Sequence, residues 1–404
     1  MAERPGVVVL SAVLPHPRMD NAGGNYVYHV VTSLAAEAEV TVLVPNDPTN
    51  RAAREQPGVV PGRLLDTSAR AVPVRAISWL LFHLRRLVGR VNASPPPLVF
   101  GWALLTDRAA RAELRRARVV DLQWSEFIGL APLVRRLAPQ ARLVGTFHDV
   151  LSQRYQRYAE AGERSLPRWA WRSSARFMRA AERRALRRLD LAITLSEKDR
   201  ALLPGGRART AVITPPIPAP ESEQPRSARP TVLFVGNLGR DDNIDAVEWL
   251  VAEIWPLVRE RFPDAELHLV GARAPERVRA VAEAAAGVVL DGFVDDLGAA
   301  YARAWAVVVP LRLGAGIKFK TIEALLGGVP LVTTPVGLEG IDAADLVEAV
   351  STVPRELADA LTRVLADPAA ARDRARAAQA RAGQQFGPGA FESSLQAAYA
   401  PELR

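Results

Sequence analysis

The chain has 404 residues, of which 49% are hydrophobic and 24% are charged, and it contains no cysteine. This length suffices for two or three compact domains, and the composition is that of an ordinary globular protein. The lack of cysteine excludes disulfide scaffolds, cysteine-ligated metal sites and thiol catalysis. With only five histidines spread along the chain, the sequence predicts no metal site.

The net charge of +8 is unevenly distributed. Residues 1–220 carry 33 Lys and Arg against 18 Asp and Glu, whereas residues 221–404 carry 19 against 26. This contrast predicts two domains with different surfaces. The basic half fits an attraction to nucleic acid, an anionic membrane or an acidic partner, and a merely solvated arginine-rich surface explains it equally well.

Lysine is rare in this arginine-rich chain. Only Lys198, Lys318 and Lys320 occur, and two of the three are two residues apart. An ammonium group acts as a compact point charge, unlike the planar guanidinium, so this spacing indicates a local need for such a charge.

No apolar stretch approaches the ~20 residues that a membrane-spanning helix needs. The longest candidate, Ile77–Leu84, contains His83 and is followed by two arginines. The first residues show no cationic segment followed by an apolar one, as a signal peptide would. We therefore expect a cytoplasmic protein.

Short apolar runs alternate with helical patterns in the first half. The expected strands are Val7–Leu14, Val40–Val44, Val119–Leu122, Arg142–Phe147 and Leu191–Leu195. A turn-rich segment at 21–25 precedes a helical pattern through Leu34, and further helices are expected at 105–116 and 168–189. This alternation predicts a parallel, doubly wound sheet.

A proline-rich stretch at 215–230 reads as a linker, and a second alternation of strands and helices follows it. Strands are expected at 231–235, 266–270, 288–290, 306–309 and 330–333. Helices are expected at 243–262, 275–285, 297–303 and 317–326, and a helical region at 354–403. We predict an α/β protein of two facing Rossmann-like domains with a cleft between them.

The predicted boundaries place the N-terminal domain at 1–218 and the linker at 219–230. The second domain is expected at 231–385, and a C-terminal helix at 386–404 is expected to pack back on the first domain.

Ligands of open parallel sheets bind outside the carboxyl ends of the strands. Gly236–Arg240 directly follows the first strand of the second half. Glycine lets a ligand approach the backbone closely, and Arg240 is suited to contact a phosphate. An ordinary tight turn would have the same pattern.

A second loop, Gly314-Ala315-Gly316, lies between a strand and a helix. The free N–H groups and positive dipole at that helix start favour an anion such as pyrophosphate. Lys318 is expected in the first turn, where it opposes the dipole unless a phosphate is bound, and Glu323 is placed to accept hydrogen bonds from a ribose. The alternative is a salt-bridged surface helix with a glycine-rich cap.

Two further candidates follow strands of the first half. His148 comes at the end of Arg142–Phe147, where the alternative is a histidine that merely caps the strand. Gly23 and Gly24 follow the first strand and would admit a sugar or phosphate close to the backbone, although a plain turn also fits.

Together these motifs resemble the retaining glycosyltransferases of family 4, also called glycosyl transferases group 1, which have the GT-B fold. The resemblance is strongest in the second half, over FVGNLGRDDNIDAVEWL and LDGFVDDLGAAYARAWAVVVPLRLGAGIKFKTIEALLGGVPLVTTPVGLEGI. In the first half it rests on Gly23-Gly24, on His148-Asp149 and on RRALRRLDLAITLSEKD.

The resemblance implies that the domain at 1–218 binds the acceptor and that the domain at 231–385 binds the nucleotide sugar. It also implies roles for residues of the second half. Arg240 and Lys318 would hold the donor diphosphate, and Glu323 the ribose. The backbone around Phe293 and Val294 would contact the base.

Other implied contacts concern the transferred sugar. The amides of Gly314-Ala315-Gly316 would lie against the sugar and phosphate, His148 would contact the donor sugar, and Gly23-Gly24 would border the acceptor and phosphate. His148, Arg240 and Lys318 are the residues expected to act in catalysis. Many members have a glutamate eight residues before the ribose-binding one, and this chain has Ala315 there.

The expected activity is transfer of a sugar from a nucleoside-diphosphate sugar with retention, with no metal and no cofactor. Cations and amides would stabilise the charge on the leaving diphosphate, and domain closure would exclude water. The expected acceptor is a small molecule, a carrier-bound intermediate or a lipid, with possible peripheral membrane contact and no nucleic acid. The composition resembles that of actinobacterial proteins, which fits glycosylation in natural-product biosynthesis or of the cell envelope.

Two other functions stay open. One is a nucleotide-sugar epimerase of the same fold, which would need additional carboxylates in the cleft. The other is a non-enzymatic binder of an anionic membrane or nucleic acid, using the arginine-rich helix at 164–188 and the apolar segment at 79–82 next to Arg85 and Arg86.

Overall fold

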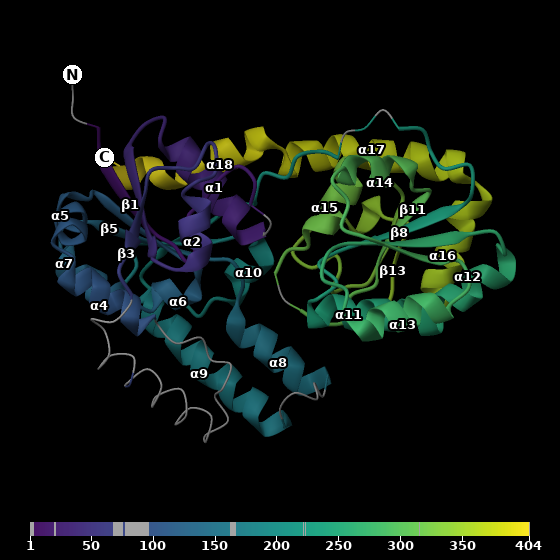
Figure 1. The fold of residues 1–404 in the computed structure, drawn as a ribbon, viewed down its shortest axis with the longest axis horizontal. Coiled ribbons are helices and arrows are strands. Elements are labelled where there is room, and N and C mark those ends of the chain that lie inside the picture. Colours follow the sequence, from purple (N-terminus) through teal and green to yellow (C-terminus); the bar gives the residue numbers. More distant parts are fainter. Residues whose placement is uncertain are drawn as a thin grey trace. The chain divides into compact units, whose positions relative to one another are not determined.

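The computed structural model describes residues 4–19, 22–67, 76, 97–161, 167–220, 222, 224–314 and 316–403. The chain forms two compact units, and each is described by itself (Figure 1). Unit 1 comprises residues 1–215 and 391–404, and unit 2 comprises residues 216–390. The apolar segment at 79–82, its two arginines and Ala315 lie outside the described residues.

Unit 1 is built on a seven-stranded parallel sheet with the order β3-β2-β1-β4-β5-β6-β7. The strands are β1 (Gly6–Leu10), β2 (Glu39–Pro45), β3 (Gly62–Leu65), β4 (Val119–Gln123), β5 (Arg142–Phe147), β6 (Leu191–Thr194) and β7 (Arg209–Val212). The central strands β1 and β4 are almost entirely buried, as expected for a parallel sheet covered on both faces.

The helices of unit 1 connect these strands. They are α1 (Ala22–Leu34), α2 (Pro48–Ala53), α4 (Leu98–Thr106), α5 (Arg108–Arg116), α6 (Trp124–Ile128), α7 (Ala131–Leu137), α8 (Leu151–Ala161), α9 (Arg168–Leu186) and α10 (Glu197–Leu202). The end of the chain, in α18 (Pro388–Leu403), also packs in unit 1, where Phe391, Leu395 and Tyr399 are buried.

Two expectations for unit 1 were wrong in detail. The segment at 21–25 was expected as a turn, but α1 already begins at Ala22, so Gly23 and Gly24 lie in its first turn. The single helix expected at 105–116 is two helices, because the side chain of Asp107 caps the start of α5 by accepting a hydrogen bond from the amide of Ala110 at 2.9 Å.

Unit 2 has a six-stranded parallel sheet with the order β10-β9-β8-β11-β12-β13. Its strands are β8 (Thr231–Val235), β9 (Glu266–Val270), β10 (Val288–Gly292), β11 (Ala306–Val309), β12 (Leu331–Thr333) and β13 (Ala349–Val350). The two parallel sheets confirm the predicted α/β class. The short strands β3, β7 and β13 were not expected from the sequence.

Helices cover both faces of the unit 2 sheet. They are α11 (Asp241–Trp249), α12 (Trp255–Arg261), α13 (Glu276–Ala284), α14 (Leu297–Arg303), α15 (Phe319–Leu326), α16 (Pro354–Ala366) and α17 (Pro368–Phe386). Figure 1 shows α14, α15 and α17 on one side of the sheet and α11 and α13 on the other. The predicted helix at 243–262 is interrupted by a π-helical turn at Leu250–Ile254, next to Pro256.

Candidate active site

Unit 2 reverses its strand order at the centre of the sheet. β8 pairs with β9 on one side and with β11 on the other, so the connections leave β8 and β11 in opposite directions. The carboxyl ends of two such neighbouring strands form the usual ligand site of an open α/β sheet. The loops at 236–240 and 310–318 both start there.

Glycines allow the backbone loops at this edge to pack closely. Gly271, directly after β9, has a φ of +150°, and a Cβ on it would lie 1.6 Å from the carbonyl oxygen of Gly236. A Cβ on Gly236 would lie 2.7 Å from Nζ of Lys320. Any larger residue at position 236 would therefore displace that ammonium group.

Arg240 and Asp242 form a bidentate ion pair at the start of α11. Nε and Nη2 of Arg240 donate to the two carboxylate oxygens of Asp242, each at 3.0 Å. Burial would raise the pKa of Asp242, but the hydrogen bonds from Arg240 and the charges of Lys320 and Lys318 outweigh it, so the pKa is lowered. The pair fixes the Arg240 guanidinium beside the 236–240 loop.

Lys320 is a second basic side chain at the same edge, and it was not among the residues predicted for the site. Its Nζ donates to Oδ1 of Asn243 at 2.6 Å and lies 4.5 Å from the ring centre of Phe234. Removal from water lowers the pKa of Lys320 to about 7, against the opposing effect of Asp242. The signal that pointed to it was the pairing of two of the chain's three lysines.

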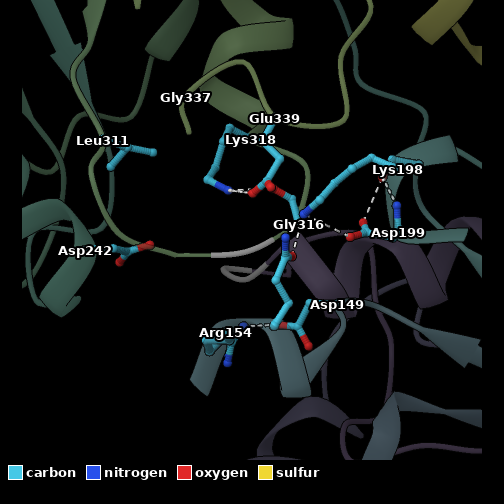
Figure 2. Close-up of polar contacts among 12 residues, drawn as sticks. Asp149, Arg154, Lys198, Asp199, Asp242, Leu311, Gly316, Lys318, Gly337 and Glu339 are labelled. Atoms are coloured by element: carbon cyan, nitrogen blue, oxygen red, sulfur yellow. Dashed lines mark hydrogen bonds and ion pairs between the residues drawn. The ribbon is translucent and has the colours of Figure 1, made fainter. Parts of the chain in front are cut away.

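Lys318 takes a different position from the one expected. It is the N-cap residue before α15 rather than part of its first turn. Its Nζ donates to the carbonyl of Gly316 and lies 3.9 Å from a carboxylate oxygen of Glu339, and the side chains of Lys318 and Glu339 are only 8% and 7% exposed (Figure 2). The ammonium group is therefore held by the protein beside the loop.

Hydroxyl groups fix the loops that surround Lys318. Thr334 donates its hydroxyl to the carbonyl of Leu311 and accepts from the amide of Gly337 at 3.0 Å. Thr321 donates to the carbonyl of Gly337 at 2.7 Å. These bonds tie the segments after β11 and β12 to α15, so the loop is preorganised before any ligand binds.

The remaining predicted residues of unit 2 occupy the same edge or the neighbouring strand. Glu323, on α15, accepts a hydrogen bond from the hydroxyl of Tyr301 at 2.8 Å, and its pKa is raised mainly by burial. Gly314 has a φ of +107°, which favours glycine. Phe293 follows β10 and is 72% exposed, whereas Val294 packs against the core.

Unit 1 also reverses its strand order, between β1 and β4. His148, next after β5, lies near this point and forms a hydrogen bond from its Nε2 to Oε1 of Gln123 at 2.9 Å. Its ring stacks on Trp124 with centres 4.5 Å apart and meets Tyr26 edge-on at 5.2 Å. Figure 2 also shows the next residue, Asp149, paired with Arg154.

The amide of Gln123 determines which ring nitrogen of His148 carries the proton. Nε2 of Gln123 donates to Oδ2 of Asp121 at 2.7 Å, so its carbonyl oxygen faces His148 as an acceptor. Nε2 of His148 must then be the donor, and Nδ1 is an acceptor. Burial lowers the pKa of His148 to about 3, so the ring is neutral at physiological pH.

The network continues into the C-terminal helix. The hydroxyl of Tyr399, on α18, donates to Oδ2 of Asp121 at 2.7 Å. Burial raises the pKa of Asp121 to about 6, although the bonds from Tyr399 and Gln123 act in the opposite direction. Asp121 and Tyr399 were not predicted as site residues, because they lie 278 residues apart and meet only in the folded chain.

Gly23 and Gly24 lie on α1, in the same unit as His148. A Cβ on Gly23 would approach the indole of Trp124 to 3.1 Å. Trp124 itself has a φ of 66°, which is unusual for a residue other than glycine. Gly23 therefore makes room for the indole on which His148 stacks.

Among the described residues, no group of three His, Asp or Glu side chains is arranged to hold a metal ion. No helix in this described part of the chain is both long and apolar enough to cross a membrane.

Comparisons with known proteins match both halves of the chain. The family model described as Glycosyltransferase Family 4 matches residues 23–219, and the model described as Glycosyl transferases group 1 matches residues 229–367. The glycogen synthase of Mycobacterium tuberculosis is 28% identical over 393 residues, which cover 90% of this chain and 87% of that protein.

Solved structures share the fold over nearly the whole chain. Sucrose-phosphate synthase from Thermosynechococcus elongatus has a TM-score of 0.71 at 20% identity and covers 98% of this chain and 99% of its own. Anabaena HepE in complex with UDP-glucose has a TM-score of 0.65 at 16% identity, with coverage of 98% and 99%. The fold is therefore GT-B, and the chain belongs to the group 1, family 4 glycosyltransferases and is itself a glycosyltransferase.

Proposed function

We propose that the enzyme transfers a sugar from a nucleoside-diphosphate sugar with retention and without a metal ion. The observation that carries the proposal is the convergence of Arg240, Lys318 and Lys320 on the carboxyl edge of the unit 2 sheet, where the strand order reverses. An edge of this kind binds nucleotides in many α/β proteins. Complexes of the structural neighbour HepE with UDP and with UDP-glucose support the same class of donor.

The three cations suit the charge that develops in the reaction. Cleavage of the sugar–phosphate bond places negative charge on the leaving diphosphate. Side chains that are already held in position stabilise this charge without reorganising during the reaction. Asp242 positions Arg240, Asn243 positions Lys320, and the Gly316 carbonyl and Glu339 position Lys318.

The first unit contributes a neutral imidazole. The family pattern assigns His148 to the donor sugar, and its Nδ1 is the nitrogen left to accept a hydrogen bond from a hydroxyl group. A charged imidazolium has no such acceptor, so the low pKa of His148 favours this role. We assign no nucleophile.

A thermal-shift panel with UDP, GDP, dTDP and ADP, each with EDTA or Mg²⁺, tests the donor proposal. A ligand at 100 times its Kd stabilises the protein by about 2.7 kcal/mol. We expect one nucleoside diphosphate to raise the melting temperature equally in EDTA and Mg²⁺. A shift that needs Mg²⁺ would contradict metal independence, and the lack of any shift would contradict the donor site.

Among the predicted acceptors, a lipid at an anionic surface is favoured by a feature of α9. Arg172, Arg176 and Arg183 share an exposed face of this helix with Trp169, which is 58% exposed. Tryptophan and arginine together suit a negatively charged membrane surface. We expect the enzyme to sediment with phosphatidylglycerol vesicles and not with phosphatidylcholine vesicles. Sedimentation of the same fraction of enzyme with both kinds of vesicle would contradict a lipid acceptor at an anionic surface.

A further inference from the structure

A pocket of about 510 Å³ lies in unit 1 at the amino ends of β5, β6 and β7. Arg142 and Arg209 are the first residues of β5 and β7, and Asp190 directly precedes β6. His148 follows the opposite end of β5, about 20 Å away at ~3.3 Å per strand residue. The pocket is therefore separate from the candidate active site of unit 1.

The lining of the pocket is dominated by arginine. It contains Arg135, Arg142, Arg187, Arg188, Arg207 and Arg209, together with the carboxylates of Asp190 and Glu402. The positive charges exceed the negative ones by four. A cavity of this size is typical of small-molecule sites.

The two carboxylates hold three of the guanidinium groups in place. Asp190 accepts from Arg135 at 2.7 Å and lies 3.6 Å from Arg142. Glu402, whose side chain is only 4% exposed, lies 3.1 Å from both Arg142 and Arg209. These pairs neutralise part of the charge and form a fixed wall.

The other three arginines are not neutralised. Arg187, Arg188 and Arg207 are exposed, and their guanidinium groups have no hydrogen bond or ion pair with any described residue. Like charges gathered in one pocket repel one another, and a bound anion relieves this repulsion. The planar guanidinium fits the oxygens of a phosphate group in a bidentate manner.

We propose that this pocket binds a ligand carrying two or more phosphate groups, contacted by Arg187, Arg188 and Arg207. A multiply charged ligand matches the positive excess of the pocket better than a monoanion does. Arg142 and Arg209, fixed by Glu402, complete the positive surface at the amino ends of the strands.

Calorimetric titration with inorganic pyrophosphate tests the proposal. The full-length Lys318→Ala variant is used as the background, because it weakens the diphosphate site proposed in unit 2. We expect saturable binding of one pyrophosphate. Adding Arg187→Gln and Arg207→Gln should weaken this binding at least about tenfold, since two charge-assisted contacts are lost.

Arg115→Gln with Arg116→Gln is the matched control. It removes the same charge from exposed positions on α5 in the same unit and should leave pyrophosphate binding unchanged. Equal weakening by both double variants would overturn the proposal, because general charge would then explain the binding.

Cardiolipin vesicles, whose lipid carries two phosphate groups, distinguish a lipid source of the phosphates from a soluble one. Vesicle binding that depends on Arg187 and Arg207, without pyrophosphate binding, assigns the phosphate groups to lipid headgroups. Pyrophosphate binding without such vesicle binding assigns them to a soluble ligand. If neither pyrophosphate nor the vesicles bind, the proposal is overturned. That result would not contradict the donor site proposed in unit 2.

Discussion

The two units use the same topology to build opposite electrostatic environments. In each sheet the strand order reverses near the centre, at β1 and β4 in unit 1 and at β8 and β11 in unit 2. Unit 2 places Arg240, Lys318 and Lys320 at this point. Unit 1 places the neutral His148 there, between aromatic rings and an amide.

This difference in charge arises from the residues that surround the functional side chains, because the two sheets share the same topology. Around Lys318, the carboxylate of Glu339 and the carbonyl of Gly316 lie close enough to hold a cation at a buried edge. Around His148, burial lowers the pKa and keeps the ring uncharged, and Gln123 stands between the ring and the carboxylate of Asp121. Unit 2 is thus suited to an anion, and unit 1 to the hydroxyl groups of a sugar.

The largest expected effect comes from removing a cation of unit 2. Lys318→Ala should lower kcat/KM about 10²- to 10³-fold, the usual result of deleting one preorganised group that stabilises a developing anion. Steady-state kinetics with the donor identified by the thermal-shift panel measures it. Arg229→Gln is the control, because the side chain of Arg229 is 70% exposed and its ion pair with Glu266 lies at the surface. A loss below about tenfold for Lys318→Ala would remove it from the proposed catalytic group.

The next effect tests the network of unit 1. Tyr399→Phe should lower the free energy of unfolding by about 1.5–3 kcal/mol at pH 8, because a buried carboxylate loses a hydrogen bond. Urea denaturation measures it, with Tyr28→Phe as a control outside the network.

The effect of Tyr399→Phe should depend on pH. The raised pKa of Asp121 means that the folded protein binds more protons than the unfolded one between about 3.8 and 6, so this group's contribution to stability falls as pH rises through that window. Without the Tyr399 hydroxyl the pKa of Asp121 rises further. The free energy of unfolding then continues to fall up to a higher pH than in the wild type. The free energy of unfolding of Tyr399→Phe should therefore differ less from that of the wild type at pH 5 than at pH 8. A larger difference at pH 5 would contradict an ionised Asp121 as the acceptor.

The sequence predicted the fold class and the site loops for physical reasons. Continuous apolar runs followed by glycine-rich turns indicate buried parallel strands and their carboxyl ends, and this pattern locates Arg240, Lys318 and His148. The sequence did not predict Asp121 or Tyr399, which are 278 residues apart and interact only after the chain has folded. Nor did it predict the N-cap position of Lys318, which depends on how Gly316 turns.

A smaller effect tests the packing of the loop against Lys320. Gly236→Ala should weaken nucleotide binding about tenfold, because its Cβ would lie 2.7 Å from Nζ of Lys320 and displace this flexible side chain. The fold should remain, since the backbone of Gly236 has no positive φ.

The matched control for Gly236→Ala is Gly383→Ala in α17. Apart from the backbone of its own helix, no atom of the described residues lies within 4 Å of the Cβ that it would add. This change should raise the free energy of unfolding by about 0.5–1 kcal/mol and leave nucleotide binding unchanged. If Gly236→Ala also binds the nucleotide as tightly as the wild type does, the position of Lys320 does not matter for the ligand.

The smallest effect is a proton taken up on binding. At pH 8 Lys320, with a pKa of about 7, is mostly neutral in the free enzyme. A diphosphate beside it favours the charged form, so binding should bring close to one proton onto the protein. The terminal phosphate of the nucleotide, with a pKa near ~6, is already ionised at that pH and takes up none.

Calorimetry in two buffers of different ionisation enthalpy measures this uptake as a difference in the apparent binding enthalpy. Lys320→Met should remove the difference and keep the fold. The lowered pKa of Lys320 also affects the stability of the protein without ligand. Between pH 7 and 10.5 the unfolded chain binds more protons at Lys320 than the folded chain does, so the contribution of Lys320 to the free energy of unfolding rises with pH across that range. An equal proton uptake in wild type and Lys320→Met would place the titrating group elsewhere and leave Arg240 and Lys318 as the cations of unit 2.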